Sequence, residues 1–104
     1  MDNKINKYHR ILKQIENLIS QCNNPLTRMS TINAILYHKM KTFSWVGFYL
    51  LDDVQLIAGP YQGPLACQIL EKNKGVCWAS INAQETIIVP DVHNFPGHIA
   101  CDKR

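Results

Sequence analysis

The sequence lacks the features that would direct it to a membrane or a nucleic acid. It contains no run of about 18 apolar residues, which a membrane-spanning helix requires. Its N-terminus, MDNKINKYHR, is polar and has no apolar core of a signal peptide. Lys and Arg form no run of five or more, and the formal net charge is only +3. We therefore expect a cytoplasmic protein that binds neither membranes nor nucleic acids.

Charge is scarce as well, and internal repeats, low-complexity segments and linkers are absent. Charged residues make up 18% of the chain and hydrophobic residues 46%, which is a globular composition and not a disordered one. A chain of 104 residues is one domain or part of one. We expect residues 1–104 to form a single domain.

The four cysteines include no Cys-x-x-Cys pair, which argues against a zinc ribbon and a thioredoxin-type motif. A structural disulfide framework is not expected in the cytoplasm either. Cys67, Cys77 and Cys101 lie at intervals of 10 and 24 residues. Because thiolates and imidazole suit zinc, a site made of these three residues and His98 stays an alternative. Cys22 is expected to be an inert thiol without a role.

Cys101 is the candidate reactive thiol. It follows FPGHIA, in which Pro96-Gly97 predicts a turn and places His98 close to the cysteine in sequence. The thiolate is the reactive form of cysteine, and a nearby imidazolium or exposed backbone amides would stabilise it. His93 and His98 are predicted to be hydrogen-bonded loop residues and not catalytic bases. A buried, inert thiol is the alternative for each of the three cysteines.

Two amphipathic helices are predicted in the N-terminal part of the chain. Apolar residues recur at three- and four-residue spacing over roughly residues 3–21, with polar residues between them. CNNP then interrupts the pattern. Asn24 is the expected cap of the second helix, with Pro25 at its first position, where a missing N–H does no harm. This helix is expected to end near Lys41.

A short antiparallel sheet is predicted to follow. The aromatic and β-branched run FSWVGFYLL predicts a buried strand, and Asp52-Asp53 predicts the turn into a second strand, VQLIAGPYQG. PLACQIL is a candidate third strand, VCWASINAQ a short helix that begins near Gly75, and TIIVPDV a last strand. The order predicts an α+β domain with an antiparallel sheet. Four strands at most are a thin sheet for two long helices to cover, which is the pattern of a domain cut short.

Four segments resemble a known family. SWVGFYLL, GPYQGPLAC, KGVCWAS and VPDVHNFPGHIACD are similar to signature segments of the free methionine-(R)-sulfoxide reductases, GAF-domain enzymes that reduce methionine sulfoxide as the free amino acid. The resemblance runs from the second predicted helix to the last residue, and more loosely through the first helix. It implies a GAF-like antiparallel sheet flanked by N-terminal helices, without the C-terminal strands and the final helix of the family.

The resemblance also implies roles for five residues. By position, Cys101 matches the catalytic cysteine of the family, and Cys67 and Cys77 match the two cysteines that resolve the oxidised intermediate. Trp45 and Tyr49 match the aromatic residues that wall the pocket around the methyl-sulfur end of the substrate. Their i, i+4 spacing in a strand is consistent with this role because it puts both side chains on one face.

The implied reaction is thiol chemistry without a metal or organic cofactor. The Cys101 thiolate attacks the sulfoxide sulfur, methionine leaves, and Cys101 is left as a sulfenic acid that condenses with a nearby thiol to a disulfide. An external dithiol, with thioredoxin as the expected partner, restores the thiols by exchange. The spacing does not decide whether Cys67 or Cys77 attacks first.

The sequence also departs from the family pattern. Trp78 stands where the family usually has a small Gly, and a bulky ring there is expected to reshape the pocket. The later acidic residues that hold the substrate's amino group have no counterpart in these 104 residues. An inactive GAF-type fragment that binds a ligand or regulates another protein is therefore the alternative function. Unpaired strand edges favour pairing with another chain, so a homodimer is also expected.

Overall fold

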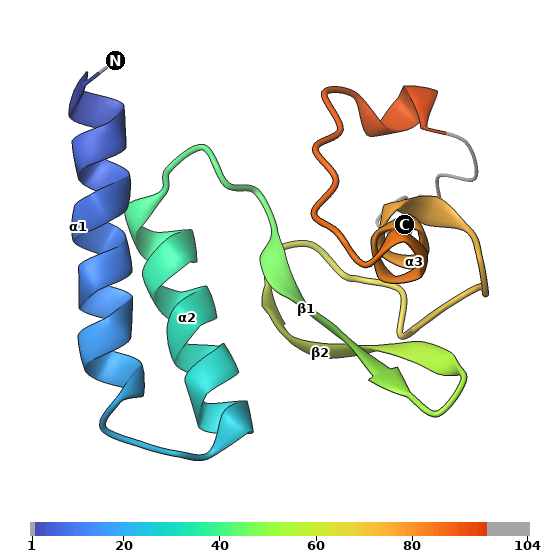
Figure 1. Ribbon diagram of the computed structural model, residues 1–104, viewed down its shortest axis with the longest axis horizontal. Coiled ribbons are helices and arrows are strands. Elements are labelled where there is room, and N and C mark those ends of the chain that lie inside the picture. The colour runs from blue at the N-terminus through green and yellow to red at the C-terminus, as the bar shows by residue number, and fades with distance from the viewer. Residues whose placement is uncertain (1, 96–104) are drawn as a thin grey trace. The chain divides into compact units, whose positions relative to one another are not determined.

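The computed structural model describes residues 2–95, and its elements follow the predicted order of two helices, a hairpin and a short helix (Figure 1). The elements are α1 (Asp2–Ile19), α2 (Pro25–Lys39), β1 (Val46–Asp52), β2 (Gln55–Gln62), β3 (Ile69–Leu70), α3 (Gly75–Ala83) and the 3-10 helix η1 (Val92–Asn94). The described residues divide into two compact units, 2–48 with 60–64 and 49–59 with 65–95. That the chain forms a single domain stays a prediction.

The predicted helices α1 and α2 are confirmed, and the local sequence explains where α2 begins. The side-chain oxygen of Asn24 accepts a hydrogen bond from the Thr27 N–H at 3.1 Å, which satisfies one of the free donors of the first turn. Pro25 follows at the first helical position, where its fixed φ suits the helix. No helix within residues 2–95 combines the length and the apolar character that crossing a membrane requires.

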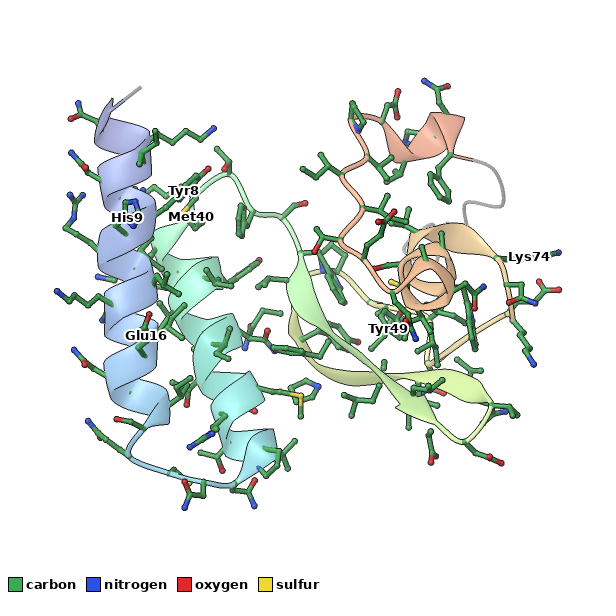
Figure 2. The ribbon with its side chains drawn as sticks, in the orientation of Figure 1. Tyr8, His9, Glu16, Met40, Tyr49 and Lys74 are labelled. Atoms are coloured by element: carbon green, nitrogen blue, oxygen red, sulfur yellow. The ribbon has the colours of Figure 1, made fainter. Side chains whose placement is uncertain are left out.

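The core of the first unit lies between α1 and α2, which are packed side by side (Figure 1). Its buried members are Ile11 of α1, Ile35 of α2 and Met40 just after α2, with Ile15 and Leu36 packed against them. Figure 2 shows Met40 beside α1. The Met40 N–H also donates to the Leu36 carbonyl at 2.9 Å, so this residue both ends the helix and fills the core.

The sheet has three antiparallel strands in the order β1-β2-β3, so the predicted α+β class is confirmed. The hairpin between β1 and β2 turns at Asp53, whose φ of 57° lies in the left-handed region that Asp tolerates. On its other edge β2 pairs with β3 in the register Leu56↔Leu70. Leu56 is completely buried, as a central strand position requires. The predicted third strand PLACQIL shortens to the two residues of β3.

The short helix α3 begins at Gly75, as predicted, and its packing depends on Trp78. Gly75 has a φ of 82°, a conformation that side-chain-bearing residues rarely adopt. Trp78 is buried, and its indole N–H donates to the Leu70 carbonyl at 3.3 Å. Trp78 is therefore a core side chain that holds α3 to β3.

The predicted last strand, TIIVPDV, is wrong within the described residues. Residues 86–89 have no strand assignment, and the side chain of Ile88 is 89% exposed. A strand needs a partner for its backbone groups, and residues 2–95 place none beside this segment. The segment instead leads into η1, where a carboxylate oxygen of Asp91 accepts from the His93 N–H at 3.0 Å.

The cap at Asn24 gives a direct test of this fold. We expect Asn24→Ala to lower the free energy of unfolding by about 0.5–2 kcal/mol, because the Thr27 N–H loses its acceptor. Urea denaturation followed by far-UV circular dichroism measures the loss. Asn24→Asp is the matched control, since its carboxylate keeps an acceptor at the same position and should retain most of the stability. Equal midpoints for Asn24→Ala and the unchanged chain would contradict the capping role.

Candidate functional site

The cysteines differ in oxidation state and burial. Cys67 is disulfide-bonded, whereas Cys77 and Cys22 are free. Cys77 is half-buried in the first turn of α3, and Cys22 is exposed between the first two helices. Cys101, the predicted nucleophile, lies outside the described residues. The two predicted resolving cysteines thus differ in oxidation state: Cys67 is in a disulfide and Cys77 is a free thiol, which their sequence spacing did not indicate.

Burial makes Cys77 a poor nucleophile at neutral pH. It raises the pKa of the Cys77 thiol, because removing the group from water disfavours the charged thiolate. The folded chain therefore stabilises the protonated thiol, and reaction at this sulfur requires a higher pH than for an exposed cysteine. These properties are closer to those of a buried structural thiol than to those of an activated thiol.

The backbone around Cys67 is held by hydrogen bonds on two sides. The Tyr49 hydroxyl of β1 donates to the Cys67 carbonyl at 2.7 Å. At the next residue, the Gln68 carbonyl accepts from the Ala58 N–H of β2 at 2.8 Å. Figure 2 labels Tyr49. The predicted pocket residue Tyr49 thus fixes the main chain of a predicted catalytic cysteine.

Trp45, the other predicted pocket residue, belongs to the first unit and forms an aromatic pair. It lies immediately before β1 and stacks on Tyr61 of β2, with ring centroids 5.4 Å apart and planes 20° from parallel. Gly47 leaves room for this pair: a Cβ at Gly47 would lie 2.7 Å from the Trp45 ring and overlap the Cβ of Tyr61. Tyr49 lies in the second unit, so a common pocket wall formed by Trp45 and Tyr49 stays a prediction.

Sequence reasoning assigned no role to Tyr61. The sequence signal for Tyr61 was Gly47 in the facing strand, because a Gly inside a strand often marks a place where another group approaches closely. Finding the partner of Gly47 needed the register of the two strands, which the sequence alone left open. The structure resolves this by placing Tyr61 and Trp45 together over Gly47.

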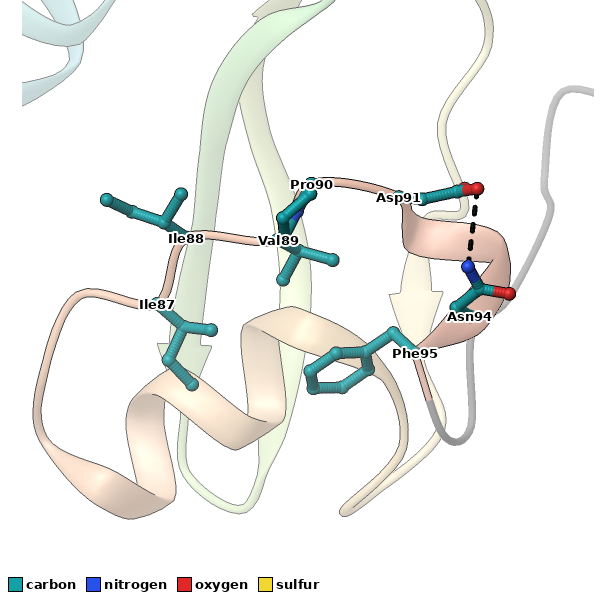
Figure 3. A pocket seen from close by; sticks show the side chains of 7 residues that line it. All are labelled: Ile87, Ile88, Val89, Pro90, Asp91, Asn94 and Phe95. Carbon is teal, nitrogen blue, oxygen red and sulfur yellow. Dashed lines mark hydrogen bonds between the residues drawn. The ribbon is translucent and has the colours of Figure 1, made fainter.

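An open pocket of about 330 Å³ lies in the second unit, in the segment that precedes Cys101 in sequence (Figure 3). Its lining is Ile87, Ile88, Val89, Pro90, Asp91, Asn94 and Phe95. The pocket is mainly apolar, and Asp91 is its one acidic residue. One Asp91 oxygen accepts from the His93 N–H and the other from the Asn94 side chain at 3.5 Å. Sequence reasoning missed this pocket because it interpreted the segment as a strand.

Of the four ligands of the zinc alternative, only Cys67 and Cys77 lie within the described residues, so this alternative stays untested. Residues 2–95 contain no cluster of three or more His, Cys, Asp or Glu side chains placed to hold a metal ion. The sulfur of Cys67 is in a disulfide, whereas zinc binds thiolates. His98 lies outside the described residues, and the backbone N–H of His93 donates to the Asp91 side chain that caps η1, so the role of the His93 ring stays a prediction.

Comparison with known proteins adds relatives that cover nearly all of this chain. No family model matches the chain. GAF domain-containing protein A of Dictyostelium discoideum is 43% identical over 94% of the chain and 62% of its own length. The free methionine-R-sulfoxide reductase of Saccharomyces cerevisiae is 37% identical over 96% of the chain and 59% of its own length. The chain thus spans about three-fifths of the curated relatives that it matches.

Solved structures agree with the sequence relatives. The free methionine-R-sulfoxide reductase of Neisseria meningitidis, solved in complex with its substrate, superimposes with a TM-score of 0.87 at 35% identity, covering 92% of this chain and 58% of that one. A structure described as that of the GAF domain gives a TM-score of 0.86 at 37% identity, covering 95% and 60%. Over the part that it spans, the chain therefore has the GAF fold and is a homologue of the free methionine-R-sulfoxide reductases.

Proposed function

We propose that the chain carries the cysteine chemistry of a free methionine-R-sulfoxide reductase, with Cys101 as nucleophile and Cys67 as resolving thiol. The observation that carries this proposal is the oxidation state of Cys67, which is disulfide-bonded while Cys77 and Cys22 are free. With four cysteines in the chain, Cys101 is the partner that we propose for Cys67. Similarity to proteins named as free methionine-R-sulfoxide reductases supports the proposed activity, and the roles of the two cysteines are part of the proposal.

The proposed reaction balances without a metal or organic cofactor. The Cys101 sulfur attacks the sulfoxide sulfur, the oxygen passes to Cys101 as a sulfenic acid, and methionine leaves reduced by two electrons. The Cys67 thiol then displaces the oxygen of the sulfenic acid as water and forms the disulfide. An external dithiol breaks this disulfide by exchange and is itself oxidised to a disulfide. Over the whole cycle, the sulfoxide oxygen and the two hydrogens of the external dithiol are converted to one water molecule.

Cys67 suits the resolving step better than Cys77 for a physical reason. A resolving thiol must approach the sulfenic acid as a nucleophile, and burial raises the pKa of Cys77 and so lowers its thiolate fraction. The main chain of Cys67 is meanwhile held by Tyr49. We propose that Cys77 acts only after the disulfide of Cys67 has formed.

Trp45 and Tyr49 are the proposed aromatic wall for the methyl-sulfur end of the substrate. The stack of Trp45 on Tyr61 supports this role because it holds an apolar ring face in a fixed orientation. The proposed external dithiol is thioredoxin, in keeping with a cytoplasmic location where such reductants act. A homodimer also belongs to the proposal, since β1 and β3 are the edge strands of the sheet within the described residues and can pair with another chain.

Replacement of the nucleophile gives the first test of this function. We expect Cys101→Ser to abolish formation of methionine from free L-methionine-(R)-sulfoxide with dithiothreitol, because serine cannot accept the oxygen. Chromatography of the amino acids measures the product. Cys22→Ser is the matched control and should keep full turnover, since Cys22 is exposed and outside the proposed site. Turnover by Cys101→Ser, or its absence in the unchanged chain, would contradict the proposal.

Removal of the resolving thiol should separate the two chemical steps. In Cys67→Ser we expect one methionine per chain without reductant and a sulfenic acid on Cys101, since the first step needs no second thiol. Dimedone labelling followed by peptide mass spectrometry detects the sulfenic acid. The same experiment on Cys77→Ser should give a disulfide instead. Dimedone adducts in Cys77→Ser but not in Cys67→Ser would reverse the assignment of the two residues.

The raised pKa of Cys77 is testable by alkylation. Below its pKa the Cys77 thiol is protonated and unreactive, so its rate of reaction with iodoacetamide should rise at a higher pH in the folded chain than in urea, where burial is lost. Peptide mass spectrometry measures the alkylation of Cys77 in both states. A pH profile of the folded chain at or below the profile in urea would show that burial does not control this thiol.

A further inference from the structure

Asn33 is the one polar side chain buried within the described residues, at 1% exposure. It lies on α2 in the first unit, and neither the sequence patterns nor the proposed chemistry assigns it a role. Burial of an amide is unfavourable unless its hydrogen-bonding groups find partners. Only half of this amide does so: the Nδ2 group donates to the Pro60 carbonyl at 2.7 Å, while Oδ1 is buried without a hydrogen-bond partner.

The unsatisfied oxygen indicates that stability alone does not explain Asn33. A buried acceptor without a donor destabilises the folded chain, whereas an apolar side chain of similar volume has no such group to satisfy. Ile35, two residues further along α2, is an apolar side chain that packs in the core with Ile11 and Met40. What the amide provides, and an apolar residue cannot, is the donor to Pro60.

Pro60 is a position in β2 where the backbone needs an outside donor. Two residues earlier, the Ala58 N–H points to the β3 edge and donates to Gln68. Because backbone groups of alternate residues point to the same edge of a strand, the Pro60 carbonyl points to that edge too, beyond the register of β3. Pro60 has no N–H of its own to pair there. Asn33 supplies the donor that a longer neighbouring strand would supply.

The hydrogen bond from Asn33 to the Pro60 carbonyl lies next to the aromatic pair of Trp45 and Tyr61. The residue after Pro60 is Tyr61, whose ring stacks on Trp45 above Gly47. The space is narrow, since even a methyl group at Gly47 would overlap the Cβ of Tyr61. A shift of the β2 backbone at Pro60 therefore moves the Tyr61 ring relative to Trp45.

We propose that Asn33 is a positioning residue for the Trp45–Tyr61 pair, acting through the Pro60 carbonyl. Its consequence for catalysis rests on the proposed function: by fixing the Trp45 ring face, Asn33 sets how tightly the methyl-sulfur end of the substrate is held. Asn33 itself contacts the backbone of β2 and not the reacting atoms.

Fluorine NMR of the chain labelled with 5-fluorotryptophan tests the positioning directly. The two tryptophans give two resonances, assigned with Trp45→Phe, and Trp78 is the internal control because it lies in the second unit. Gly47→Ala gives the reference shift for a displaced pair. Asn33→Leu removes the donor while filling the volume, so we expect the Trp45 resonance to move or broaden, the Trp78 resonance to stay, and the urea midpoint to be kept or raised.

The conservative variant Asn33→Asp adds a pH-dependent measurement that would not change if Asn33 had a merely structural role. In Asn33→Asp the neutral carboxylic acid can donate to Pro60, whereas the carboxylate cannot. The Trp45 resonance should therefore lie near its original position at low pH and move away as the carboxyl ionises. Ile35→Val is the matched control, since it weakens the same helix core but should leave both resonances in place. A stationary Trp45 resonance in both Asn33 variants, or equal movement of Trp78, would overturn the proposal.

Kinetics separates this inference from the proposed function. We expect Asn33→Leu to raise the KM for free L-methionine-(R)-sulfoxide several-fold and to leave kcat nearly unchanged. A displaced Trp45 resonance with an unchanged KM would overturn the link to substrate binding. If the unchanged chain shows no turnover, the proposed function fails, and the fluorine spectra alone decide the positioning role.

Discussion

Hydrogen bonding along β2 is the constraint on which the other features of the described structure depend. β2 is the central strand of the three, and Leu56 at its centre is completely buried. From one end of β2 to the other, its backbone groups are engaged by β3, by the loop after Cys67 and by Asn33. The Tyr61 ring belongs to β2, and the main chain just after Cys67 is held to β2 by the hydrogen bond from Ala58 to Gln68.

The cysteines illustrate how environment divides chemically identical groups. Cys77 lies in the first turn of α3, a position that by itself favours a thiolate, yet burial raises its pKa. Cys67 lies in a loop whose backbone is fixed and is disulfide-bonded. Cys22 is free and exposed between α1 and α2. The proposed roles follow from these differences in solvation and anchoring, since the side chains themselves are the same.

The sequence predicted the local features well and the non-local ones poorly. Periodic apolar residues and the Asn24-Pro25 pair located α2, and Gly75 located α3, because these signals act within one or two turns. The strand expected at residues 86–92 did not form, since strand formation depends on a partner that the local sequence does not reveal. The pairing of Tyr61 with Trp45 and the bond from Asn33 to Pro60 join residues far apart in the chain, so neither has a local signature.

The hydrogen bond from Tyr49 to the Cys67 carbonyl has a kinetic meaning for any cycle of oxidation and reduction at this residue. Because the main chain is held at Cys67 and again at Gln68, opening a disulfide there releases the sulfur without releasing the backbone. The thiol then has only its own side-chain rotation to search before it meets a neighbouring sulfur again. Such a restricted search raises the effective concentration of one sulfur around the other, in the way that a short tether does. In the proposed function, this anchoring by Tyr49 shortens the time that the Cys67 thiol needs to reach its partner, although Tyr49 takes no part in transferring electrons.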